Sequence, residues 1–262
     1  MRKFAVGTAV CGALALSALA VPSAQALTPD ITFSNVVVNS GKAITVGTTN
    51  TVIVPVTYTI TRSADVQFDD VNAMVMLYRG TSFTTAQNVL GPGDAPSCTA
   101  VNDTTQNCTG DISITPQGDL YEAADATTWK TAGEYIRMGD DGVDVIARNT
   151  GSTATIKRAA KLTTNATPEP VAKGKTLTVK GSLTRATWSS GTYTGYASQP
   201  VTLQFRAKSS TTYSDVKTVT SGTGGALSTT VTASVDGYYR YKFAGTSTTA
   251  AKTSTSDYVD VQ

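Results

Sequence analysis

The chain has 262 residues, 21 basic and 19 acidic side chains, and no histidine. Without imidazole, Ser-His-Asp and Cys-His catalysis, nearly all catalytic zinc sites and the usual general base near neutral pH are excluded. The charge is uneven: residues 27–158 carry eight basic and fourteen acidic groups, and residues 159–262 carry eleven and five. Such asymmetry could steer a partner, or it could reflect two ordinary surfaces that attract each other, which we favour.

The N-terminus has the features of a secretory signal peptide. Arg2 and Lys3 precede an apolar run over residues 4–21, and residues 24–26 form an Ala-Gln-Ala cleavage pattern. We therefore expect residues 1–26 to be removed and the mature protein to be secreted and extracellular. A retained membrane anchor is the alternative. No later stretch approaches the roughly 20 apolar residues that cross a bilayer, so we expect no membrane span after cleavage.

Two cysteines remain after cleavage, Cys98 and Cys108. An even pair in an oxidising compartment most simply forms a disulfide. A metal or redox role fits less well, because it would need more ligands or a Cys-x-x-Cys spacing. We expect the bond to close a short loop and to stabilise the fold by about 2–3 kcal/mol in the loop-entropy model.

Short β-strands are expected along the first half, where β-branched and aromatic residues alternate with polar ones. Pro55 indicates an edge strand or a bulge, and Trp129 is expected in the core between two sheets. We expect residues 80–110 to be rich in loops, with a turn at residues 91–94, and residues 119–127 to form a short helical turn. The expected strands are residues 31–38, 43–46, 52–60, 71–79 (the central strand), 111–115, 133–137, 143–148 and 154–157.

The last third of the chain has the clearest alternation of apolar and polar residues. Val201, Leu203 and Phe205 alternate with polar side chains, and so do the residues of the run from Tyr238 to Phe243. One face of each strand should therefore be buried. Regularly spaced strands of this kind, separated by Gly/Ser/Thr turns, predict an antiparallel sandwich or barrel. Tyr238 or Tyr239 is expected to make a hydroxyl-to-backbone corner bond.

Three runs of the second half resemble the bacterial immunoglobulin-like modules of exported actinomycete proteins. They are residues 174–181, 199–206 and 236–247. The segment around Cys98 and Cys108 is similar to the front domain of two-domain secreted proteins of uncharacterised function from the same bacteria. The resemblance implies an all-β chain with two tandem immunoglobulin-like antiparallel β-sandwiches and no catalytic motif, and some relatives carry a calcium-binding label. We place the two sandwiches at residues 27–158 and 159–262, joined by a short connection that allows only a limited hinge.

Five aspartates in the first domain are the candidate ligands for a calcium ion. Calcium takes six to eight oxygen ligands, with several carboxylates converging from loops. The spacing is not that of an EF-hand, and Asp-Asp-Gly between two strands is also typical of a hairpin turn without metal. We favour the turn, and therefore expect no cofactor, with calcium as the alternative. The candidates are Asp69, Asp70, Asp140, Asp141 and Asp144.

A Gly/Ser/Thr-rich segment of the second domain contains Trp188, Tyr193 and Tyr196. Exposed aromatic rings of this kind suit stacking on carbohydrate rings. The alternative, which we favour, is a hairpin folded over one end of the sandwich, with its aromatic side chains capping the core.

The sequence thus predicts a secreted, non-enzymatic protein with a binding, adhesion or structural role, and a calcium-binding or carbohydrate-binding module as alternatives. The partner would be an extracellular protein or polysaccharide, bound along acidic end loops or an exposed strand edge. The basic half lacks dense Arg/Lys runs and interleaved aromatic and basic positions, so we expect no nucleic acid. Glu122, Glu134 and Glu169 show no recognisable acid/base pairing, although two carboxylates could still converge in space.

Overall fold

The computed structural model describes residues 31–64, 71–139 and 142–262. Within them the chain forms β-strands and a few three-residue 3-10 turns, with no α-helix, so the all-β prediction is confirmed. None of the helices in the described residues is long and apolar enough to cross a membrane. The 3-10 turns are η1 (Asn39–Gly41), η3 (Ala123–Asp125), η4 (Trp188–Ser190) and η5 (Thr223–Gly225).

Two sheets pack face to face in the first half of the chain. One has the order β1-β3-β7-β6 and the other β2-β9-β8-β4-β5, and all pairs are antiparallel except β2 with β9. Their strands are β1 (Ile31–Val38), β2 (Ile44–Val46), β3 (Val52–Arg62), β4 (Val71–Arg79), β5 (Asn88–Leu90), β6 (Ser97–Asn102), β7 (Thr105–Ile114), β8 (Thr128–Gly139) and β9 (Gly142–Arg158).

The core of this first sandwich follows from the alternation along its strands. On β3, Val54, Val56 and Tyr58 are buried, whereas the residues between them are exposed. Trp129 is completely buried, as expected for an inter-sheet anchor, and its indole N–H donates to the backbone oxygen of Asp125 at 2.9 Å. This donor would be costly if it were buried without an acceptor.

The second half forms a second sandwich of two sheets. One has the order β15-β14-β17-β18 with β19 also paired to β17, and the other has β10-β12-β11 with β13 and β16 paired to β12. Its strands are β10 (Ala160–Leu162), β11 (Asn165–Thr167), β12 (Thr176–Thr187), β13 (Thr192–Gly195), β14 (Pro200–Ala207), β15 (Ser214–Thr220), β16 (Ala226–Thr232), β17 (Gly237–Phe243), β18 (Lys252–Thr253) and β19 (Asp257–Val259). Val201, Leu203, Tyr239, Tyr241 and Phe243 are buried between the sheets, as the alternation predicts.

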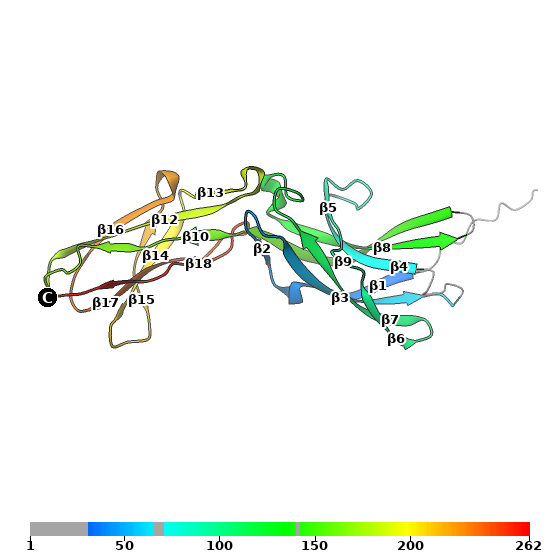
Figure 1. Cartoon of the computed structure of the whole chain (residues 1–262), viewed down its shortest axis with the longest axis horizontal. Coiled ribbons are helices and arrows are strands. Elements are labelled where there is room, and N and C mark those ends of the chain that lie inside the picture. The colour runs from blue at the N-terminus through cyan, green and yellow to red at the C-terminus, as the bar shows by residue number, and fades with distance from the viewer. Residues whose placement is uncertain (1–30, 65–70, 140–141) are drawn as a thin grey trace, which may run out of the picture.

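The two sandwiches lie end to end along the long axis of the molecule (Figure 1). A single residue, Ala159, separates β9 of the first sandwich from β10 of the second. The C-terminus lies at the end of the molecule that is remote from the first sandwich (Figure 1). The connection therefore follows the β-strands directly and contains no flexible tether.

Some local expectations are wrong. Residues 80–110 are rich in loops, as expected, but the disulfide lies on the paired strands β6 and β7 and not in a loop. The strand over residues 71–79 is not central: β4 lies next to the edge strand β5. Pro55 lies in β3, which is an inner strand. The pairing of β3 with β1 ends at Val56, so Pro55 lies at an edge only locally.

In the described residues, neither Tyr238 nor Tyr239 makes the expected corner bond. Tyr241 instead donates its hydroxyl hydrogen across the core to the backbone oxygen of Val179 on the opposite sheet, at 2.9 Å. Tyr58 makes the equivalent bond in the first sandwich, to the backbone oxygen of Ala73 at 2.9 Å. In each case a buried ring fills the core while its polar end finds a backbone acceptor.

Candidate functional site

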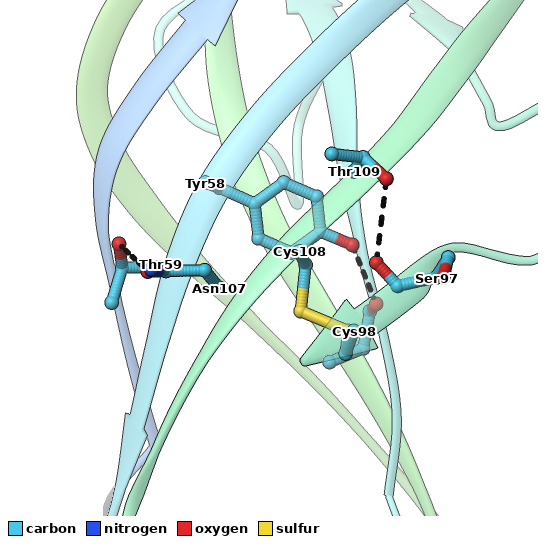
Figure 2. The surroundings of a disulfide bond; sticks show 8 residues. Tyr58, Thr59, Ser97, Cys98, Asn107, Cys108 and Thr109 are labelled. Atoms are coloured by element: carbon cyan, nitrogen blue, oxygen red, sulfur yellow. Dashed lines mark hydrogen bonds between the residues drawn. A yellow bond between two sulfur atoms is a disulfide. The ribbon is translucent and has the colours of Figure 1, made fainter. Parts of the chain in front are cut away.

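The structure forms the predicted disulfide between Cys98 and Cys108. The two residues lie directly opposite each other on β6 and β7, so the bond joins neighbouring strands of a hairpin and not the ends of a loop. Cys108 is in turn the direct neighbour of Tyr58 on β3. Figure 2 shows this row of side chains. The disulfide thereby ties the edge strand β6, whose side chains are all exposed, to the buried part of the sheet.

A shallow polar groove lies on the sheet beside this disulfide. It has a volume of about 400 Å³ and is lined mainly by Asn and Thr side chains of β1, β3, β6 and β7. Thr59 donates to the amide oxygen of Asn107 at 2.9 Å, and Asn35 donates to Thr59 at 3.3 Å (Figure 2 shows the first of these bonds). These side chains satisfy one another, so the groove offers no group of unusual reactivity.

Four of the five calcium candidates, Asp69, Asp70, Asp140 and Asp141, lie outside the described residues. Asp144 lies in β9, opposite Arg137 of β8, but its side chain is also outside what the structure describes. Within the described residues no three His, Cys, Asp or Glu side chains form a group that could hold a metal ion. The calcium hypothesis stays a prediction.

The three aromatic candidates do not form an exposed stacking platform. Trp188 is 1% exposed, so its indole face is not open for stacking, contrary to the less favoured hypothesis. The amine of Lys161 lies 3.9 Å from the ring centroid of Tyr193. The guanidinium carbon of Arg185 lies 4.0 Å from the ring centroid of Tyr196. The rings are used in packing and cation–π contacts, as in the alternative of a hairpin that caps the core.

Trp188 connects the two sandwiches. It begins η4, directly after β12 of the second sandwich, yet it and Ala186 of β12 pack in the hydrophobic core of the first. Its indole N–H donates to the backbone oxygen of Val46 in β2 at 3.4 Å. The backbone N–H of Ala159 donates to the same oxygen at 2.9 Å. We call this set of contacts the junction.

Backbone bonds between β9 and the loop over residues 246–250 extend the junction. Arg158 donates its backbone N–H to Thr248 at 3.0 Å and accepts a bond from Ala250 at 2.9 Å. The amine of Lys157 donates to the backbone oxygen of Thr246 at 2.8 Å. A groove of about 470 Å³ runs beside these contacts; Lys42, Lys157 and Ser247 are among its lining residues. Hydrogen bonds and buried aromatic surface thus join the two sandwiches at the junction.

The three glutamates lie in different surroundings, and two carboxyl groups do converge at one of them, Glu169, which is hydrogen-bonded to Asp257. Glu122 forms an ion pair with Arg79. Glu134 lies in β8, and burial raises the pKa of its carboxyl group. The pKa of Glu169 is raised by burial and by the neighbouring carboxylate of Asp257. Each glutamate thus has a separate structural setting.

Sequence reasoning missed a row of aromatic and basic side chains on the outer face of β14, β17 and β19. Strand register places Tyr258, Tyr238 and Arg206 side by side on three neighbouring strands. Arg240 lies two residues after Tyr238 on β17 and so faces the same side of the sheet. The expectation that the basic half lacks interleaved aromatic and basic positions is therefore wrong. The signal was present in the alternation itself, because every second residue of these strands faces water.

Comparison with known proteins identifies no family for this chain, and the matches to solved structures are distant. No family model matches the chain, and no curated protein matches it. Among solved structures, domains A168–A170 of titin match at 9% identity and a TM-score of 0.23, over 84% of this chain and 62% of that one.

Two further structures match at similar levels. The full ectodomain (Ig1–Ig3) of mouse nectin-like molecule 4 matches at 13% identity and a TM-score of 0.23, over 87% of this chain and 65% of that one. The three N-terminal domains of the Hoc protein of bacteriophage RB49 match at 11% identity and a TM-score of 0.31, over 88% and 71%. Similarity this low does not transfer the roles of these proteins to this chain.

Proposed function

We propose that the protein is a secreted, non-catalytic module of two domains, residues 27–158 and 159–262, that has a binding, adhesion or structural role outside the cell. The junction carries this proposal. A buried tryptophan from one sandwich in the core of the other fixes the orientation of the domains. A rigid, elongated pair of domains, which we call the rod, can hold a binding surface on one domain at a defined distance and angle from the other domain.

The extracellular location is supported by two features. The Cys98–Cys108 disulfide is of the kind that persists in oxidising compartments. The signal-peptide pattern of residues 1–26 is the second, although it lies outside the described residues. The absence of histidine supports the non-catalytic role.

Small-angle X-ray scattering tests the rigid junction. We expect the wild-type protein to scatter as one extended particle of fixed dimensions. Trp188→Ala should broaden the distribution of domain separations, because the ring that fixes the orientation is gone. Trp188→Phe is the matched control, since it keeps an apolar ring at the same position. A flexible wild-type protein, or equal scattering by both variants, would contradict the proposal.

A further inference from the structure

The outer face of the β14–β17–β19 sheet carries a continuous stack of side chains, which we call the Tyr/Arg ladder. Its members are Tyr258, Tyr238, Arg206, Tyr213 and Arg240. The rings of Tyr258 and Tyr238 have centroids 5.1 Å apart. The guanidinium carbon of Arg206 lies 3.8 Å from the ring centroid of Tyr238 and 5.4 Å from that of Tyr213. That of Arg240 lies 3.6 Å from the Tyr213 centroid.

The two arginines of the ladder are held in place without a counter-charge. Arg206 donates to the backbone oxygen of Ser210 at 2.8 Å, and Arg240 donates its Nε hydrogen to the side-chain oxygen of Gln204 at 2.9 Å. Gln204 is itself fixed by Asp215 at 2.7 Å. In the described part of the chain neither guanidinium forms an ion pair with a carboxylate. Arginine presents five donors, so most remain free for an anion.

Two lysines extend the line of basic side chains along the strands, and one of them, Lys208, pairs with Asp236 at 3.5 Å. Lys208 follows Arg206 by two residues on β14 and its loop, and Lys242 follows Arg240 by two residues on β17. Residues two apart on a strand are separated by roughly 7 Å on one face. The domain carries eleven basic and only five acidic residues, so this face lies on a cationic half of the molecule. A row of cations at regular spacing matches a linear polyanion.

The chemistry of the ladder favours hydrogen bonding over stacking. A guanidinium group lies over the rings of Tyr238 and Tyr213, which leaves less of these ring faces open to a nucleobase or a neutral sugar ring. The polar groups of this partly buried face are the guanidinium N–H groups, the phenol hydroxyls of Tyr213 and Tyr238, and the carboxylates of Asp215 and Asp236. A hollow of about 360 Å³ lies at the tyrosine end of the ladder, lined by Lys208, Asp236 and Val235 among others.

We propose that this face binds a linear anionic polysaccharide, with its carboxylate groups on Arg206 and Arg240 and its hydroxyl groups on the phenols. Arginine pairs with planar carboxylates in a two-bond geometry, which suits uronic acids. The proposal builds on the extracellular role proposed above by naming the class of partner.

Calorimetry with a galacturonate oligosaccharide, and with a neutral glucose oligosaccharide of equal length, tests the proposal on the purified protein. We expect binding of the acidic oligosaccharide only, and weaker binding at higher salt. The double variant R206Q/R240Q should bind roughly tenfold or more weakly, because each arginine loses charge-assisted hydrogen bonds. Arg185→Gln is the matched control, since Arg185 also stacks on a tyrosine but lies on the opposite sheet, and it should bind like the wild type.

Lys242→Gln keeps the test decisive if the double variant does not fold. Lys242 is exposed and should affect affinity alone, by roughly two- to fivefold. The proposal is overturned if the wild-type protein binds neither oligosaccharide, binds both equally, or binds single-stranded DNA more tightly, or if Arg185→Gln loses as much affinity as R206Q/R240Q. If the two domains were not held in a fixed orientation, the small-angle scattering data would show it, and those data do not depend on the ladder.

Discussion

The guanidinium of Arg158 lies over the indole ring of Trp188, with its central carbon 5.2 Å from the ring centroid. Arg158 ends the last strand of the first sandwich, and Trp188 follows a long strand of the second. Arg158 is only 7% exposed. Its pKa is lowered by burial and by the nearby charge of Arg185. The ring thus shields a buried cation at the point where the two sandwiches meet.

This relationship predicts that the two sandwiches unfold together. Trp188→Ala should lower the free energy of unfolding by about 3–5 kcal/mol, the usual cost of removing a buried tryptophan side chain. It should also separate a single unfolding transition into two, because the sandwiches lose their shared core. Urea titration monitored by circular dichroism measures the free energy of unfolding. Calorimetry, as a separate experiment, shows whether there are one or two unfolding transitions. Two well-separated transitions in the wild-type protein would show that the junction does not couple the sandwiches.

A second prediction concerns Asp125, whose side chain is completely buried. Its carboxylate accepts hydrogen bonds from Arg79 Nε at 2.9 Å and from the backbone N–H groups of Tyr121 at 2.8 Å and Glu122 at 3.0 Å. Asp125→Ala should cost about 3–5 kcal/mol of stability, since it leaves Arg79 without its buried partner.

The exposed ion pair between Lys208 and Asp236 is the control for Asp125. Its atoms are 3.5 Å apart and its lysine side chain is 61% exposed. Lys208→Gln should leave the urea midpoint unchanged, because solvent screens such pairs. Equal midpoints for Asp125→Ala and the wild type would show that the Asp125 contacts contribute nothing to stability.

The disulfide gives a third prediction. The bond spans a sequence separation of ten residues, so its removal in C98A/C108A should cost about 2–3 kcal/mol by the loop-entropy model. Reducing agent should lower the urea midpoint of the wild type by a similar amount and should leave the double variant unaffected. A wild-type midpoint that does not respond to complete reduction would contradict the loop-entropy argument at this site.

Sequence alternation predicted the fold well because period two is a local property. The burial of Val54 and Val56 on β3, and of Leu203 on β14, follows directly from it. The junction could not be predicted in this way. Whether Trp188 packs on its own sandwich or on the neighbouring one depends on how β10 continues from β9, which is a property of the assembled sheets. The hypothesis of a capping hairpin was therefore correct for Tyr196, which packs on the core of the second sandwich, whereas Trp188 and Tyr193 pack on the core of the first.

The Tyr/Arg ladder was missed for a different reason. Arg206 and Tyr238 are 32 positions apart in the sequence, so no single run of residues shows that the two side chains are neighbours. Only the register of β14 against β17 makes them neighbours. A search of the solvent-facing positions of paired strands, instead of a search for dense basic runs, would have found them.

The last prediction concerns alkaline pH and the two buried tyrosines. Burial raises the pKa of Tyr58 and of Tyr241 from 10.0 to about 12. Between these values the unfolded chain loses phenolic protons that the folded protein keeps, so unfolding releases protons and becomes more favourable as pH rises. The stability that is fully present below pH 10 should therefore fall by about 1.4 kcal/mol per pH unit for each tyrosine up to about pH 12.

Urea unfolding at intervals between pH 9 and pH 12 measures this slope, and absorbance of the phenolate follows ionisation directly. Tyr241→Phe should remove one tyrosine's share of the slope, while lowering stability at neutral pH because the backbone oxygen of Val179 loses its donor. The comparison of slopes cancels the titration of lysines, which are common to both proteins. Identical slopes for the variant and the wild type would mean that the Tyr241 hydroxyl ionises in the folded protein as readily as in the unfolded chain, contrary to its position between the sheets.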